Sequence, residues 1–230
     1  MPQICYTEKD FYFPPVEEAD EEGLLLIGGK VTASRILEAY QRGIFPWYSE
    51  DDWPLWWSPD PRFVLYPGEL HVSRGMEKII SGDHFEFKTD TAFEKVIEAC
   101  ATVDRAGQNG TWITAEMKEA YTQLFYEGHA HCAEAWKDGE LVGGMYGIQL
   151  GSVFFGESMF HKMKNASKFV FIKFVQELKQ EGVQLMDCQV YTAHVESLGG
   201  RLISRKEYLE HLTPTLSNGV GEGVMKTPKL

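Results

Sequence analysis

Two polar side chains, Asp187 and Gln189, lie late in an otherwise apolar segment. The segment 183–190 is predicted to be a strand, and because strand side chains alternate between two faces, Asp187 and Gln189 should share one face. A buried polar group without a partner costs about 1–3 kcal/mol, so a structural hydrogen-bonded pair would explain both residues. The functional alternative is a pair of acceptors that holds and activates an amine nucleophile.

A third candidate is Glu157, which lies between aromatic residues at the predicted end of a strand. It could be an ordinary residue at a strand terminus. Alternatively, it could receive a cationic substrate group in a pocket walled by Phe154 and Phe155. The sequence contains no GxSxG, CxxC, HExxH or Walker motif. Aminolysis of an activated ester needs none of these, because it depends mainly on positioning and deprotonation of the amine.

The elements around these residues predict an α+β fold. Antiparallel strands joined by tight turns are expected at 130–136, 141–149 and 152–157. A long apolar helix at 166–181 should follow, before the strand that carries Asp187. Meander, helix and strand in this order are typical of acetyltransferase-like (GNAT) folds, which have a mixed, mostly antiparallel sheet. Further helices are expected after a capping box at 91–94 and after Thr114.

The N-terminal part of the chain differs in composition. It is rich in Pro, Gly and Trp and predicts one clear helix, at 33–42. Proline fixes φ and lacks an N–H donor, so the Pro- and Trp-rich segment 45–62 is predicted to be neither helix nor central strand. We therefore expect a small N-terminal domain at 1–62 and a larger acetyltransferase-like domain at 63–230, with a mobile tail at 213–230.

Composition and charge narrow the classes of function. No apolar run approaches the roughly 18 residues that a membrane span needs, and no secretory signal is present, so we expect a cytoplasmic protein with no membrane partner. The formal net charge of −12 argues against extensive wrapping of a nucleic-acid duplex. The charge is uneven, because the segment 158–176 holds four lysines and no acid. That segment is either a solvated helix face or a surface for an anionic ligand.

The cysteines indicate neither a disulfide framework nor a metal site. They form no CxxC pair and lie in apolar or mixed segments, so we expect buried, reduced thiols and no metal or cofactor. A zinc site built from His129, His131 and Cys132 is the alternative, but it would place ligands on both faces of one strand. The four cysteines are Cys5, Cys100, Cys132 and Cys188.

Ten short motifs resemble those of the leucyl/phenylalanyl-tRNA–protein transferase family. They occur in the family order and span about residues 12 to 210, and several contain tryptophan, so they exceed what chance agreement produces. The motifs are 43–47 (GIFPW), 56–62 (WWSPDPR), 70–74 (LHVSR), 110–114 (GTWIT), 128–131 (GHAH), 141–147 (LVGGMYG), 155–160 (FGESMF), 165–168 (NASK), 187–190 (DCQV) and 197–200 (SLGG).

This resemblance implies a reaction. In the family, Leu, Phe or sometimes Met passes from its tRNA to a protein whose N-terminal residue is Arg or Lys, which marks that protein for degradation. The implied partners are therefore aminoacyl-tRNA and protein substrates of this kind. Matched to this sequence, Asp187 and Gln189 would hold the incoming α-amine, with Glu157 nearby.

The resemblance also implies a binding site for the donor. Trp112 would stack on the terminal adenosine of the tRNA, and Arg74 and Lys78 would contact the tRNA. The segment that holds these two cations is strongly basic in many relatives, whereas residues 74–80 here contain two cations and one acid. Apolar residues implied to line the pocket for the transferred side chain are Met145, Phe154, Phe174 and Met186.

Two other functions fit parts of the sequence. An acetyl-CoA-dependent N-acyltransferase could share the fold, but such enzymes present a Gly-rich loop to the pyrophosphate, and residues 162–168 contain no glycine. A non-catalytic adaptor for basic N-termini could use Glu157 and Asp187 as an acidic pocket.

Overall fold

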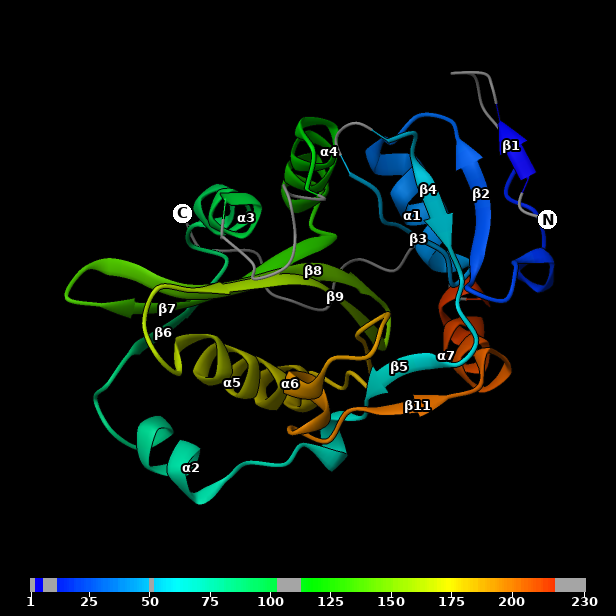
Figure 1. Cartoon of the computed structure of the whole chain (residues 1–230). Coiled ribbons are helices and arrows are strands. Elements are labelled where there is room, and N and C mark those ends of the chain that lie inside the picture. Colours follow the sequence, from blue (N-terminus) through cyan, green and yellow to red (C-terminus); the bar gives the residue numbers. More distant parts are fainter. Residues whose placement is uncertain (1–2, 6–11, 50–51, 103–112, 218–230) are drawn as a thin grey trace.

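The computed structural model describes residues 3–5, 12–49, 52–102 and 113–217 of the 230-residue chain. Two sheets organise these residues, and Figure 1 shows them side by side. The smaller sheet has the strand order β1-β2-β4-β3. Its strands are β1 (Gln3–Cys5), β2 (Leu24–Gly28), β3 (Phe45–Pro46) and β4 (Leu55–Trp57).

The helix predicted at the N-terminal end is confirmed as α1 (Ala33–Gln41), where the Thr32 Oγ1 accepts the Arg35 N–H. The prediction that the segment after it holds no central strand is wrong, because β4 pairs with both β2 and β3. β4 is free of proline and can pair along both edges, whereas Pro46 lies in β3 at the edge of the sheet.

The larger sheet has the order β11-β5-β10-β9-β8-β7-β6. The predicted meander is confirmed by the antiparallel pairing of β7, β8 and β9, and β10 then pairs parallel to β9. The α+β fold with a mixed, mostly antiparallel sheet in acetyltransferase-like order is therefore confirmed. The strands are β5 (Arg62–Leu65), β6 (Glu86–Thr89), β7 (Ala130–Lys137), β8 (Glu140–Leu150), β9 (Val153–His161), β10 (Leu185–Asp187) and β11 (Arg201–Ile203).

Helices cover both faces of this sheet. α3 and α4 pack on one face together with the N-terminal elements, and α5 packs on the other (Figure 1). Two buried apolar clusters result, one on each face. The helices are α2 (Arg74–Ile80), α3 (Phe93–Thr102), α4 (Ala115–Tyr126), α5 (Ala166–Gln180), α6 (Ala193–Glu196) and α7 (Arg205–Ser217), with short 3₁₀ turns at Val16–Glu18 and Pro67–Glu69.

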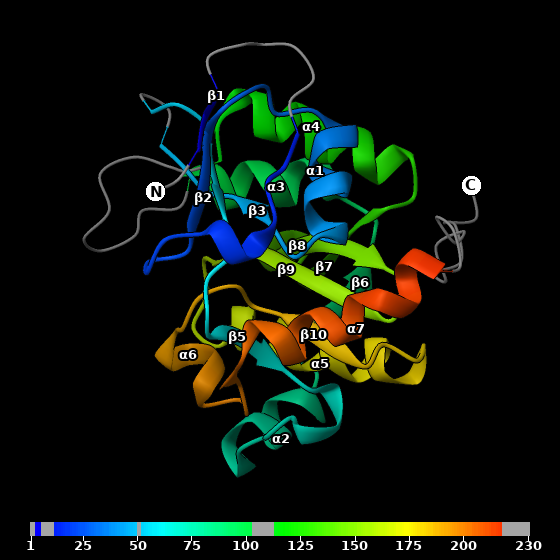
Figure 2. The same cartoon turned by 90° about the vertical axis from the view of Figure 1, so that its right-hand side faces the viewer.

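The C-terminal helix α7 lies where the N-terminal elements meet the larger sheet, as Figure 2 shows. A Cβ built on Gly43, just after α1, would lie 2.7 Å from the Leu209 side chain and 3.1 Å from Tyr208, so α7 packs directly on this turn. Gly43 has a φ of +77°, a conformation that glycine adopts without a steric penalty. α7 extends to Ser217, so it includes the start of the tail predicted at 213–230, and residues 218–230 lie outside the described ranges.

No helix in the described part of the chain is both long and apolar enough to cross a lipid bilayer.

Candidate active site

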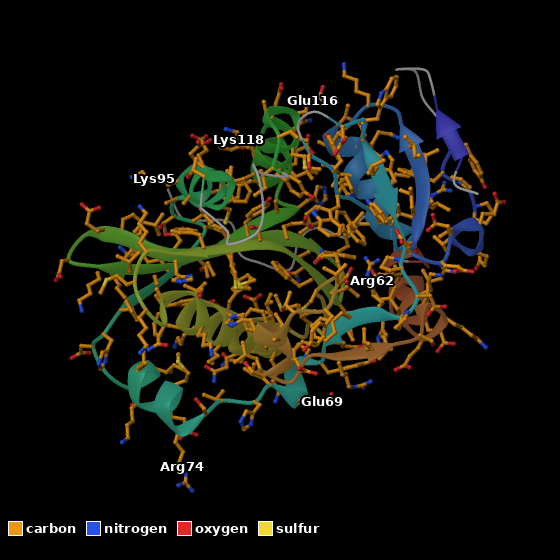
Figure 3. All side chains as sticks on the ribbon, in the orientation of Figure 1. Arg62, Glu69, Arg74, Lys95, Glu116 and Lys118 are labelled. Carbon is orange, nitrogen blue, oxygen red and sulfur yellow. The ribbon has the colours of Figure 1, made fainter. Side chains whose placement is uncertain are left out.

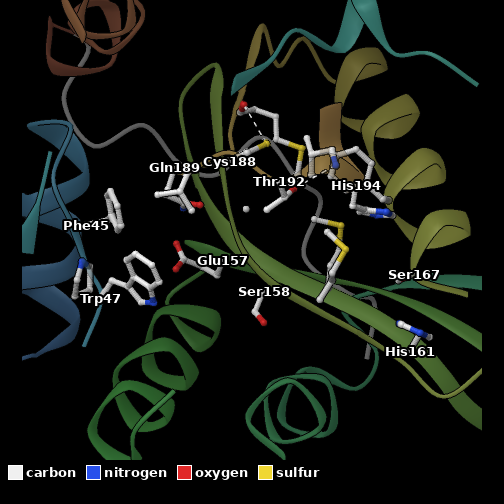
Figure 4. A pocket seen from close by; sticks show the side chains of 18 residues that line it. Phe45, Trp47, Glu157, Ser158, His161, Ser167, Cys188, Gln189, Thr192 and His194 are labelled. Carbon is white, nitrogen blue, oxygen red and sulfur yellow. Dashed lines mark hydrogen bonds between the residues drawn. The ribbon is translucent and has the colours of Figure 1, made fainter. Parts of the chain in front are cut away.

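A cavity of about 520 Å³ lies where two parallel strands part (Figure 4). β10 pairs with β9 over three residues, from the pair Leu185 and Val153 to the pair Asp187 and Phe155. β9 then continues to His161, beyond the end of its pairing with β10. The predicted strand 183–190 is thus confirmed for three residues and ends earlier than expected. The end of the pairing leaves a gap between the strands, and the segments 156–161 and 186–195 supply most of the cavity wall.

The deep part of the cavity is apolar and rich in methionine. Met145 of β8, Met159 of β9 and Met186 of β10 line it, together with Phe171 of α5. A Cβ built on Gly156 would lie 3.0 Å from the Met186 Cε and 3.9 Å from the Met145 Cε, so the missing side chain leaves this space open. Methionine is flexible and polarisable, which lets such a wall fit apolar groups of different shape.

Two of the four predicted pocket residues lie behind this wall. Met145 and Met186 reach the cavity, whereas Phe154 and Phe174 do not. The two phenylalanines are fully buried and meet edge to face, with ring centroids 5.0 Å apart. They belong to the same buried cluster as the two methionines, so they support the wall without lining it.

Gln189 reaches the cavity through an unusual backbone conformation. Its φ is +57°, in the left-handed region that residues other than glycine rarely adopt. The residue is 9% exposed and lines the cavity, and its Nε2 has no hydrogen-bond partner among the described residues. The prediction that Asp187 and Gln189 share one face is wrong, because this turn in the backbone places Gln189 on the cavity side with Met186 and Cys188.

Asp187 lies outside the cavity lining and is fully buried. Its Oδ1 accepts the Arg62 Nε–H at 2.9 Å and the backbone N–H of Gln189 at 2.9 Å. Its Oδ2 accepts the Arg62 Nη2–H at 2.7 Å and the Tyr208 O–H at 2.8 Å. All four of these hydrogen bonds come from groups of the protein itself, and one of them joins the Asp187 carboxylate to the Gln189 backbone.

The partner of Asp187 is a buried guanidinium. Arg62 is fully buried, stacks between the rings of Phe45 and Tyr208 at 4.6 Å from each centroid, and donates to the Gly43 carbonyl at 3.3 Å. Burial alone would lower the pKa of Arg62, but the adjacent Asp187 carboxylate raises it above its ordinary value. Figure 3 shows Arg62 between the two sheets. Sequence analysis missed this residue as part of the site.

Glu157 is the acid that faces the cavity. The hydroxyls of Tyr40 and Tyr121 both donate to its carboxylate, the latter at 2.9 Å. Although the residue keeps some exposure through the cavity, the pKa of Glu157 is raised to about 7, and burial is the main cause. The hydrogen bonds from the two tyrosine hydroxyls act against this rise. The charges of Asp187, which raises the pKa, and Arg62, which lowers it, have smaller effects. Burial and the nearby carboxylate also raise the pKa of both tyrosines well above 10, so both remain hydrogen-bond donors.

The two ends of the cavity differ in chemistry, as Figure 4 shows. Phe45 of β3 and Trp47, which directly follows β3, form an aromatic end, and Trp47 is 39% exposed. The Trp57 Nε1–H donates to the Trp47 carbonyl at 2.8 Å, which holds this segment against β4. A polar end is formed by His161, Ser167, Thr192 and His194. Neither end was predicted, although the Phe-Pro-Trp motif was a visible signal for the first.

Three predicted residues remain: Trp112, Arg74 and Lys78. Trp112 lies outside the described residues. Arg74 and Lys78 lie on α2, which packs against α5, and neither lines the cavity. Figure 3 shows Arg74 pointing away from the body of the protein.

The arrangement suits acyl transfer to an amine better than covalent catalysis. Burial raises the pKa of the Cys188 thiol, which disfavours the nucleophilic thiolate at neutral pH. No group of three or more metal-ligating side chains occurs within the described ranges. What the cavity offers is an apolar wall, an unpaired amide at Gln189 and a carboxyl at Glu157 whose pKa suits a general base.

Comparison with known proteins agrees with this chemistry. The sequence model described as leucyl/phenylalanyl-tRNA protein transferase matches residues 64–213, and the model of its N-terminal domain matches residues 29–60. The transferase of this name from Christiangramia forsetii is 54% identical over 202 residues, which are 87% of this chain and 95% of the relative. The one from Flavobacterium johnsoniae is 52% identical over 209 residues, which are 91% of this chain and 99% of the relative.

Similarity to solved structures is more distant. The structure of L-PGS from Bacillus licheniformis aligns with a TM-score of 0.41 and 12% identity over 74% of this chain and 54% of that chain, which is too distant to indicate a function. The sequence relationships are decisive, because two family models together span most of the chain and the relatives match it over nearly their whole length. The chain therefore belongs to the leucyl/phenylalanyl-tRNA–protein transferase family of enzymes.

Proposed function

We propose that this enzyme transfers Leu or Phe, and sometimes Met, from aminoacyl-tRNA to the α-amine of proteins that begin with Arg or Lys, and that the product is marked for degradation. The observation that carries the proposal is the cavity between β9 and β10. Its methionine wall lies beside the amide of Gln189 and the carboxyl of Glu157, so an apolar acyl group and an amine can meet there.

The donor is proposed to enter with its side chain against the methionine wall. Leu, Phe and Met side chains are apolar and differ in shape, which a wall of Met145, Met159 and Met186 accommodates by changing rotamers. The terminal adenosine would lie at the aromatic end, where the partly exposed Trp47 offers a stacking surface. Trp112, which the family motif implies for the same stacking, is proposed as its second contact.

The amine is proposed to be held by Gln189 and deprotonated by Glu157. The amide oxygen of Gln189 can accept an N–H of the amine while its Nε2 remains free to donate to the ester carbonyl. The amine nitrogen attacks the ester carbonyl carbon, and its proton passes to Glu157. The bond between that carbon and the ribose oxygen then breaks, and the leaving oxygen takes the proton that Glu157 received, which returns Glu157 to its ionised form. No cofactor enters this balance.

Asp187 has a different role in this scheme from the one that the motif alone suggests. Its carboxylate oxygens bind Arg62, Tyr208 and the Gln189 backbone, so we propose that it positions Gln189 and does not touch the amine. The ionised Glu157, the acid among the cavity-lining residues, is then proposed to attract the cationic side chain of the acceptor protein before it takes the proton of the amine. An ionised Glu157 attracts an N-terminal Arg or Lys better than a neutral one.

A transfer assay tests the proposal. Radiolabelled Leu-tRNA is incubated with the enzyme and a peptide that begins with Arg, without acetyl-CoA, and a peptide that differs in beginning with Asp is the control. The expected result is label in the Arg peptide and little in the Asp peptide. Label that enters from acetyl-CoA in place of Leu-tRNA would establish an acetyltransferase instead. Tight peptide binding without transfer from either donor would establish an adaptor.

A further inference from the structure

Gln189 holds a backbone conformation that needs support from its surroundings. A residue with a side chain rarely keeps a φ of +57° unless neighbouring groups fix it. Here the backbone N–H of Gln189 donates to the Asp187 Oδ1 at 2.9 Å, and its carbonyl accepts the Phe63 N–H at 3.3 Å. The orientation of the Gln189 amide in the cavity therefore depends on where the Asp187 carboxylate is held.

The Asp187 carboxylate is held in turn by residues far away in the sequence. Arg62 donates two hydrogen bonds to it in the bidentate geometry that guanidinium and carboxylate favour, and Tyr208 of α7 donates a third. The Arg62 side chain is itself fixed by the rings of Phe45 and Tyr208 and by the Gly43 carbonyl. All of these groups are buried, and Phe45 also lines the cavity.

This network joins the N-terminal elements, the C-terminal helix and the reaction site. Arg62 opens β5, 125 residues before Asp187, and Tyr208 follows Asp187 by 21 residues. Neither Arg62 nor Tyr208 lines the cavity. Apart from the small effect of the Arg62 charge on the pKa of Glu157, their contacts therefore reach the cavity through Asp187 and Phe45.

We propose that Arg62 and Tyr208 are positioning residues of the transfer reaction. They fix the Asp187 carboxylate so that it holds Gln189 in its left-handed conformation with the amide in the cavity. The inference rests on the proposed role of Gln189. It assigns a function to α7, whose packing against the Gly43 turn becomes part of what orders the site.

The test compares Tyr208→Phe with Tyr66→Phe. Tyr66 is the matched control because its hydroxyl also joins the chain just after β5 to α7, through Glu207 and His211 at 3.1 Å each, but away from Asp187. In Tyr208→Phe, kcat should fall about tenfold, within the hundredfold that a misplacement of about 1 Å can cost. KM for Leu-tRNA should change less than about twofold, because the methionine wall proposed to receive the leucyl side chain is intact. Tyr66→Phe should keep the wild-type kcat.

Arg62→Lys and Arg62→Met extend the test. Lysine keeps the charge but cannot form the bidentate pair, so its kcat should lie between those of the wild type and Arg62→Met. Rates are taken per folded molecule, well below the melting temperature of each variant. If Arg62→Met does not fold, the other two variants still decide the matter.

The inference is overturned if Tyr208→Phe and Arg62→Lys lower the melting temperature but keep the wild-type kcat per folded molecule. Equal changes in kcat for Tyr208→Phe and Tyr66→Phe would overturn it too. A wild-type enzyme that transfers no label from Leu-tRNA would instead refute the proposed function, so the two failures are distinguishable.

Discussion

Replacing Glu157 by glutamine should change how transfer depends on pH. Burial raises the pKa of Glu157 to about 7, and an α-amine has an ordinary pKa of about 7.7–8.0, so below pH 7 both groups must lose a proton before transfer can occur. The logarithm of kcat/KM for the acceptor should therefore rise with a slope approaching two below pH 7 and about one between pH 7 and 8. Between pH 5.5 and 6.5 the wild-type rate should rise about fiftyfold to a hundredfold.

Glu157→Gln removes one of the two titrations. Its slope should be about one throughout, so its rate should rise about tenfold over the same interval, and its activity at pH 8 should be well below that of the wild type. The assay is transfer of label from Leu-tRNA to an Arg peptide at subsaturating peptide, with short incubations and a peptide-free blank to correct for hydrolysis of the donor ester.

Tyr121→Phe gives an independent check of the same reasoning. The hydrogen bond from Tyr121 lowers the pKa of Glu157, so its removal should move the break in the wild-type profile to higher pH, by about one unit for a hydrogen bond to a charged group. A wild-type slope of one with no break near pH 7 would refute the role of Glu157 as a base. A slope of two in Glu157→Gln would do the same.

Three further changes probe the pocket and its support. Met145→Trp narrows the cavity at the methionine wall, so kcat/KM for Phe-tRNA should fall more than kcat/KM for Leu-tRNA. An unchanged ratio of these two values would show that Met145 does not contact the transferred side chain. Gly156→Ala places a methyl group 3.0 Å from the Met186 Cε and should also raise the preference for Leu, measured as the same ratio. Asp187→Asn leaves the Arg62 guanidinium without its counter-charge and should lower the free energy of unfolding by about 3–5 kcal/mol in guanidinium denaturation. A loss below about 1 kcal/mol would show that the pair is not needed for folding.

Local sequence patterns predicted the elements well where local interactions determine them. The meander follows from alternating strands separated by two tight turns, Thr114 caps its helix as predicted, and Thr32 caps α1 in the same way. The predicted capping box before α3 is different. The carboxylate of Glu134, on β7, accepts the N–H groups of Thr91 and Ala92 at 2.8 and 2.7 Å, so a distant acid takes the place of the local one.

The site was harder to predict because its decisive contacts are long-range. Alternation along a strand predicted one face for Asp187 and Gln189, but the strand ends at Asp187 and the next residues turn. Nothing in the segment around Arg62 indicates that its guanidinium is buried, since its partner lies 125 residues away. The motifs did indicate Met145, Met186, Gln189 and Glu157, all of which line the cavity.

A structure with a stable amide analogue of leucyl-adenosine would test the central claim most directly. We predict that the leucyl side chain lies between Met145 and Met186, that the carbonyl lies within hydrogen-bonding distance of the Gln189 Nε2, and that the adenine stacks on Trp47. An analogue bound outside the cavity between β9 and β10, or bound there with its carbonyl remote from both Gln189 and Glu157, would contradict the account.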